Sequence, residues 1–157
     1  MTDTLTKHER NLSAFIHASV FSRYFIPFGN IILPLILWTI NKKDYKFVDY
    51  NGKQVLNFQI SLLLYALVLG VLSVPFIFGA FPNIFEVDNM IFNPFKGFHW
   101  NLDGNNFNFG NRFFPFGIAA LAQGALIVIN IVYTILGTIR TNEGQTFKYP
   151  ISINFIK

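Results

Sequence analysis

The chain contains no cysteine and few charged residues. Only 13% of its 157 residues are Asp, Glu, Lys or Arg, whereas 52% are apolar; soluble domains usually contain roughly 25% charged residues. The absence of cysteine excludes disulfides, thiolate metal sites and a cysteine nucleophile. A soluble bundle of this size has too much surface to leave so little of it charged. The composition therefore predicts one membrane domain, residues 1–157, in contact with lipid.

Signals of catalysis and nucleic-acid binding are also lacking. The net charge is +4, but the basic residues collect at the ends of apolar segments and form no stripe, so no nucleic-acid partner is expected. No predicted span holds a carboxylate, no histidine pair has metal-ligand spacing, and no glycine-rich phosphate loop is present. We interpret His17 as a packing residue and Arg23 as a side chain that reaches the headgroups. The sequence predicts no enzyme, metal or cofactor, and no small-molecule substrate can be identified.

Two uncharged segments, 54–80 and 113–140, predict transmembrane helices. Each is longer than the roughly 20 residues that a helix needs to cross the hydrocarbon of a bilayer. The all-α membrane bundle expected from the sequence therefore has two firm spans.

The first apolar region, Leu12–Ile40, is too long for one straight span and contains helix-breaking residues. We expect two short helices, at 9–22 and 29–41, which form a re-entrant hairpin or a pair of tilted spans. The bundle then has about four helices. The residues that predict the break are Pro27, Gly29, Asn30 and Pro34.

The distribution of lysine and arginine predicts the topology. The segment 41–53 holds four lysines against two aspartates, and the segment after Ile139 holds three basic residues against one acidic residue. The loop 82–112 holds two basic against three acidic residues. Because basic residues favour the cytoplasmic side, we predict both termini and the short tail 141–157 inside, and the loop outside.

Polar residues at helical spacing mark one face in each firm span. Neutral amides in lipid are costly unless they are paired, so we interpret these residues as interhelical hydrogen-bonding and packing groups that face each other or the first hairpin. A polar path for an ion or solute is the alternative. The residues are Gln54, Asn57 and Ser61, with Tyr65 continuing the stripe, in the first span, and Gln123, Asn130 and Thr134 in the second.

The external loop 82–112 mixes phenylalanine and asparagine without a helical or alternating period. It folds over the bundle, or it forms a docking surface for a partner, because exposed aromatic patches tend to mark interaction sites. Disorder of the loop is the third alternative. The candidate docking residues are Phe92, Phe95, Phe98, Trp100, Phe107 and Phe109.

Three stretches carry a resemblance to a known family: Phe25–Pro34, Phe47–Ser61 and Tyr149–Ile156. Together they resemble a bacterial family of small integral membrane proteins of unknown function. That family is distantly similar to the twenty-kilodalton inner-envelope component of the chloroplast Tic protein-import machinery. The resemblance implies four helices with both termini on one side, a location in the bacterial cytoplasmic (inner) membrane, and a role near protein translocation or insertion as a hypothesis.

Our leading hypothesis from the sequence is a non-enzymatic, multi-pass accessory subunit of a larger membrane complex, with membrane lipid and other membrane proteins as its partners. A small channel or carrier with a polar path between its helices is the alternative. The alternating tail, 146–155, is interpreted as an extended segment, a short hairpin or a strap at the membrane surface.

Overall fold

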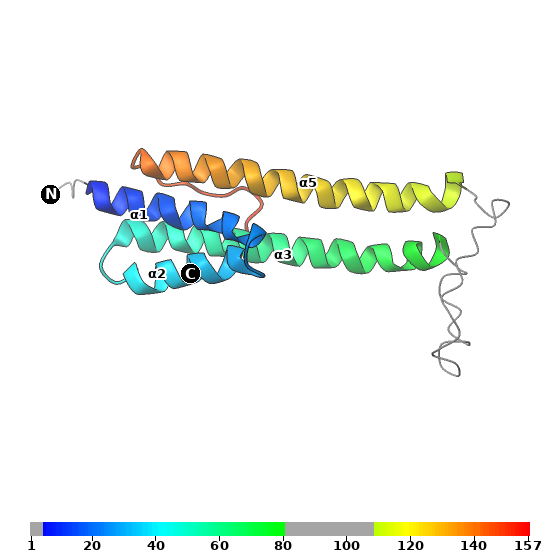
Figure 1. Cartoon of the computed structure of the whole chain (residues 1–157), viewed down its shortest axis with the longest axis horizontal. Coiled ribbons are helices and arrows are strands. Elements are labelled where there is room, and N and C mark those ends of the chain that lie inside the picture. Colours follow the sequence, from blue (N-terminus) through cyan, green and yellow to red (C-terminus); the bar gives the residue numbers. More distant parts are fainter. Residues whose placement is uncertain (1–4, 81–108) are drawn as a thin grey trace, which may run out of the picture. The chain divides into compact units, whose positions relative to one another are not determined.

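The computed structural model describes residues 5–80 and 109–157, and the regular secondary structure of these residues is entirely helical. They form α1 (Lys7–Ala18), a 3-10 helix η1 (Ser19–Tyr24), α2 (Gly29–Asn41), α3 (Lys46–Ala80) and α5 (Phe109–Asn142), followed by an extended tail (Figure 1). No strand occurs among the described residues. The predicted fold class, a small all-α bundle of about four helices, is confirmed.

Two compact parts make up the chain. The first part consists of Met1–Tyr65 and Leu126–Lys157, and the second part consists of Ala66–Ala125. The first part contains α1, η1, α2, the beginning of α3, the end of α5 and the tail, which run beside one another in Figure 1. Every cluster described below lies within one of these parts.

A capping box starts α1. The Thr6 hydroxyl oxygen accepts a hydrogen bond from the backbone N–H of Glu9, and the Glu9 carboxylate accepts one from the backbone N–H of Thr6. Both bonds satisfy N–H groups that a helix start leaves unpaired. After Ala18 the helix tightens into η1, so the first helix ends earlier than the predicted residue 22.

The chain then reverses at residues 25–28. Phe28 adopts a left-handed conformation with φ of 58°, and α2 begins at the next residue, Gly29. A Cβ atom at Gly29 would lie 2.6 Å from Oγ of Ser22, so the close approach of η1 and α2 requires glycine there. Pro34, expected with the other residues at the break, instead lies inside α2, where the helix continues through it.

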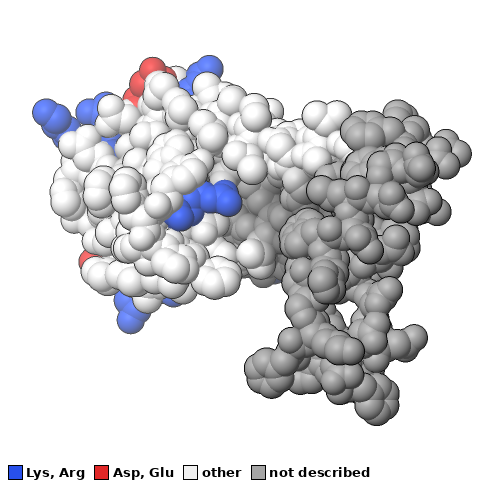
Figure 2. Space-filling view, turned by 45° about the vertical axis from the view of Figure 1, so that its right-hand side comes forward, with Lys and Arg blue, Asp and Glu red and all other residues white. Residues whose placement is uncertain are grey.

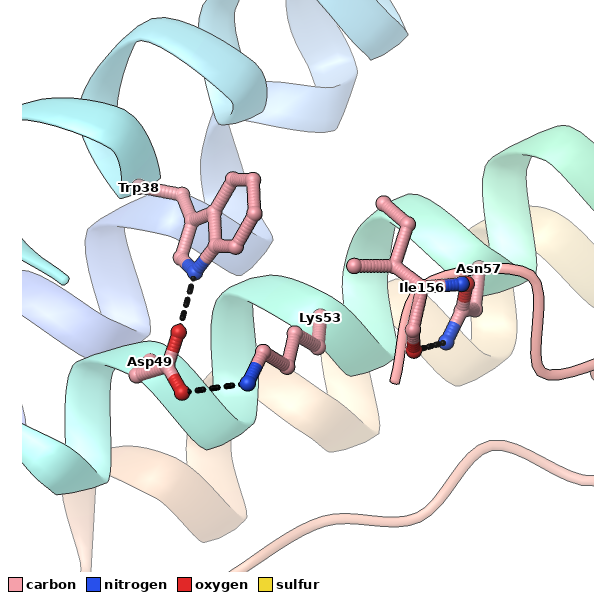
Figure 3. A network of polar contacts seen from close by, with 5 residues as sticks. All are labelled: Trp38, Asp49, Lys53, Asn57 and Ile156. Carbon is pink, nitrogen blue, oxygen red and sulfur yellow. Dashed lines mark hydrogen bonds and ion pairs between the residues drawn. The ribbon is translucent and has the colours of Figure 1, made fainter.

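Trp38 anchors α2 against α3. Its indole Nε1–H donates a 2.9 Å hydrogen bond to Asp49, which also forms an ion pair with Lys53 (Figure 3). A Cβ atom at Gly52 would collide with the indole, so this glycine allows the two helices to approach. Because α3 begins at Lys46 and not at residue 54, these partners sit on its first turns.

Two segments are long and apolar enough to cross a membrane, Lys46–Val74 and Gly117–Asn142. Only 11% of the most apolar stretch of the second segment is buried inside the described structure. Most of the visible surface of the described residues in Figure 2 is uncharged, with Lys, Arg, Asp and Glu at separate places. An apolar face of this kind needs lipid or a protein partner to cover it.

Candidate functional site: the buried polar core

A histidine and a tyrosine form the centre of the first part. His17 of α1 and Tyr149 of the tail are both almost fully buried, at 0% and 2% exposure, and 2.7 Å separates His17 Nδ1 from the Tyr149 hydroxyl. Burial raises the pKa of the Tyr149 phenol, against the opposite effect of a hydrogen bond with Thr134. The phenol therefore stays protonated.

The other ring nitrogen of His17 faces two further helices. Nε2 lies 3.3 Å from Oδ1 of Asn51 in α3 and 3.2 Å from Oγ1 of Thr141 in α5. Since the amide oxygen of Asn51 can only accept, we assign the ring proton to Nε2, which donates to these oxygens, and Nδ1 then accepts from the Tyr149 hydroxyl. One imidazole thus joins α1, α3, α5 and the tail.

Aromatic rings and a glycine enclose this pair. The Tyr149 ring stacks on Phe58 at a centroid distance of 4.2 Å, and the His17 ring stacks on the Tyr149 ring at 5.5 Å. A Cβ atom at Gly137 would lie 2.6 Å from His17 Nδ1 and 2.9 Å from the Tyr149 hydroxyl oxygen. Gly137 therefore allows α5 to pass directly over the hydrogen bond.

A second cluster of amides joins three helices. Asn30 Nδ2 of α2 donates to Gln59 Oε1 of α3, and Gln59 Nε2 donates to Asn130 Oδ1 of α5, both at 2.9 Å. The Thr134 hydroxyl donates to the same Asn130 oxygen at 3.3 Å. Each of the two amide–amide bonds crosses a helix interface, so the cluster fixes how the three helices pack.

The tail is held on α3 through its backbone (Figure 3). Asn57 Nδ2 donates to the Ile156 carbonyl at 3.0 Å, and Asn57 Oδ1 accepts from the N–H groups of Ile156 and Phe155 at 2.8 and 3.1 Å. Ser61 Oγ accepts from the N–H of Ile153 at 2.8 Å. The side-chain amide of Asn57 thus pairs with both the backbone N–H and the backbone carbonyl of Ile156, as a residue of a neighbouring β-strand would.

The residues predicted as interhelical groups have different partners. Asn57 and Ser61 bond to the tail, whereas Asn130 and Thr134 belong to the amide cluster.

Gln123 donates to the Ala66 carbonyl at 2.9 Å within the second part, so it does join two helices. Gln54 is half-buried, and it takes part in none of the side-chain hydrogen bonds of the described residues.

The remaining predicted residues lie elsewhere. Pro27 belongs to the turn, Gly29 begins α2, and Asn30 serves the amide cluster. Most of the candidate docking residues fall outside the described residues; Phe109 is the first residue of α5. The residues outside the described range are Phe92, Phe95, Phe98, Trp100 and Phe107.

Several central residues were missed by the sequence reasoning. Gln59 stands two positions after Asn57, on another face of the helix, so the stripe that identified Asn57 does not include it. Tyr149 is the first residue of one of the stretches that carry the family resemblance, and this was the available signal. Asn51 likewise lies in the stretch Phe47–Ser61. Gly137 and Thr141 had no such signal, because their importance comes from contacts distant in the sequence.

The arrangement is suited to holding helices together. Its acceptors and donors are amides, hydroxyls, one imidazole and backbone groups, and they bond mainly to one another. No group of three or more His, Cys, Asp or Glu side chains able to hold a metal occurs in the part of the chain that the structure describes. Ser13 Oγ, one turn before His17, is buried there without a hydrogen-bond partner.

Comparison with known proteins identifies one family. A family model described as the magnetosome magnetite crystal formation protein family matches residues 8–156. No curated protein and no solved structure matches the chain. The match supports the predicted bacterial family of small membrane proteins, whereas it shows no similarity to the Tic component. The matched range spans both compact parts and includes nearly every residue of the polar core. The chain therefore belongs to the magnetosome magnetite crystal formation protein family.

Proposed function

We propose that the protein is a non-enzymatic, multi-pass accessory protein of the membrane at which magnetite crystals form, where it acts with other membrane proteins. The family match over residues 8–156 supports a membrane-associated accessory protein. The observation that carries the proposal is the contrast between a polar core bonded to itself and an apolar exterior.

The polar core supports a structural role. His17, Gln59 and Asn57 each bond to at least two partners, and all three are at most 1% exposed. A catalytic group has to reach a substrate, whereas these buried side chains form their hydrogen bonds with the other helices and with the tail. Their bonds fix the shape of the first part and leave its outer surface to make contacts.

The exterior supports a role that depends on neighbours. Apolar side chains on α2 and on the end of α5 are exposed, among them Ile40 at 67% and Val128 at 60%. Lipid covers such faces in a single protein, and partner helices cover them in a complex. Small size and the absence of a recognisable substrate site in the described residues favour the second arrangement for part of this surface.

The test is deletion of the gene in the bacterium that carries it, followed by electron microscopy of its magnetosomes. We expect crystals of altered size or number, restored by the wild-type gene and by a His17→Gln variant that accumulates to the same level. Unaltered crystals in the deletion strain would reject the role in crystal formation. Loss of rescue by well-folded His17→Gln protein would instead indicate chemistry at the core.

A small channel or carrier is the second candidate, favoured by the run of amides from Asn30 through Gln59 to Asn130. The same amides bond to each other across the interfaces, which argues for packing. Reconstituted liposomes distinguish the two: flux of ions or small solutes that Gln59→Leu abolishes would support the channel. A role in protein translocation stays a prediction that rests on the family resemblance alone.

A further inference from the structure

A groove opens on the surface of the first part, between α1 and the last turns of α5. Its volume is about 330 Å³, at the lower end of the roughly 300–1,000 Å³ of ligand pockets. Two alanines of α1 leave the space open, because larger side chains at these positions would fill it. The other lining residues are Asn11, Phe15, Thr138, Ile139 and Asn142.

The groove has two asparagines at one end, whereas at the other end its one polar lining residue, Thr138, donates its hydroxyl to the Thr134 carbonyl of its own helix. The two helices run antiparallel, since Gly137 lies against His17 and Gly144 lies against Arg10. Asn11 and Asn142 therefore share the end near the start of α1, and Ala18 lies toward the other end. An occupant with a polar head and an apolar chain matches this order.

Basic side chains lie at the polar end. Lys7 precedes Asn11 by one helical turn on the same face, and its side chain is exposed. Arg10 lies against the loop after α5, and its Nε is buried without a hydrogen-bond partner among the described residues. Two acidic residues lie nearby: Glu9 binds Thr6 in the capping box, and Glu143 is exposed. Neither forms an ion pair with Lys7 or Arg10. The one salt bridge of the described residues joins Asp49 to Lys53.

We propose that this groove binds one anionic phospholipid. One acyl chain lies along Ala14 and Ala18, and the phosphate lies beside Lys7 and Arg10. Lys and Arg side chains pair with lipid phosphates at the membrane surface, and hydrocarbon covers the apolar wall. A helix from a second copy would cover the wall equally well, but it would leave the basic end without an anion. The site does not depend on the proposed accessory role.

The test uses the full chain, stripped of lipid in detergent and titrated with phosphatidylglycerol or phosphatidylcholine of identical acyl chains, with native mass spectrometry as the readout. We expect one phosphatidylglycerol per chain and weaker binding of phosphatidylcholine. Lys7→Gln lowers the affinity for phosphatidylglycerol about fivefold, since a basic residue near the membrane surface contributes about 1 kcal/mol. Ala18→Leu fills the groove and removes the bound lipid.

Two control variants match these changes elsewhere on the chain. Lys43→Gln removes the same charge from an exposed lysine, and Ala120→Leu enlarges an exposed alanine of α5 outside the groove; both retain wild-type binding. Equal binding of the two lipids, an effect of Lys43→Gln as large as that of Lys7→Gln, or unchanged binding to Ala18→Leu would each overturn the proposal. A wild-type dimer that Ala18→Leu dissociates would also overturn it, because the occupant is then a second copy.

Discussion

The two compact parts of this protein use different means to hold their helices. In the first part, amides, an imidazole and hydroxyls bond between α1, α2, α3, α5 and the tail. In the second part, Gln123 to the Ala66 carbonyl is the only such bond between helices among the described residues. Apolar packing in lipid has little directional preference, whereas paired polar groups fix one arrangement. The first part should therefore be the rigid, specific region, and substitutions should affect the two parts unequally.

The largest difference is expected for glycine substitutions. Gly137→Ala places a methyl group 2.6 Å from His17 Nδ1 and should destabilise the protein by about 3 kcal/mol through overpacking and loss of the hydrogen bond. Gly124→Ala meets nothing within 4 Å and should be neutral or stabilise α5 by up to about 1 kcal/mol. Unfolding of both variants in detergent, followed by circular dichroism, measures the pair. Equal effects would refute the proposed contrast.

Loss of the tail contacts is the next largest effect. Asn57→Leu removes three hydrogen bonds to the tail backbone and should cost about 2 kcal/mol. The tail then becomes accessible, so a cysteine introduced at Ile153 reacts faster with a water-soluble maleimide than it does without Asn57→Leu. Gln54→Leu, three residues before Asn57 in the same helix, serves as the control and leaves labelling unchanged. Slow labelling of both would show that other contacts hold the tail.

Disruption of the amide cluster should have a moderate effect. Gln59→Leu leaves the side chains of Asn30 and Asn130 without their shared partner and should cost about 1–2 kcal/mol. Asn130→Leu should cost a similar amount, and the double variant should cost less than the sum of the two, because both remove the same bond. Strict additivity would show that Gln59 and Asn130 are not coupled.

The smallest effect is expected in the second part. Gln123→Leu removes a single bond to a backbone carbonyl and should change stability by about 0.6 kcal/mol or less. Comparison with Gln59→Leu by the same unfolding assay sharpens the contrast between the parts. A loss at Gln123 as large as that at Gln59 would mean that the second part also depends on polar pairing.

Periodicity and charge predicted the helices of this chain well. The uncharged runs located both long helices, and proline and glycine between residues 27 and 30 located the reversal before α2. The start of α3 was placed too late, since Asp49 and Lys53 looked like loop residues. They belong to a helix because each finds a partner there: Asp49 pairs with Trp38 and Lys53.

The partners of the polar residues could not be predicted in the same way. The spacing of Asn57, Ser61 and Tyr65 correctly places them on one face, but periodicity does not say what covers that face. The tail covers it, and its contacts lie almost one hundred residues away in sequence. Gly137 shows the same limit, because a glycine in an apolar helix has no pattern that reveals the His17–Tyr149 pair beside it.

We propose that the polar core of the first part holds the fold and performs no chemistry, and the Tyr149→Phe variant separates these two roles. The variant leaves His17 Nδ1 without its donor and should lower stability by about 1–3 kcal/mol. Tyr24→Phe, at an exposed position, should not. We predict that Tyr149→Phe, expressed to the wild-type level in the deletion strain, unfolds more easily after purification yet restores normal crystals. Wild-type stability combined with failure to restore the crystals would show instead that the Tyr149 hydroxyl takes part in crystal formation and not in folding.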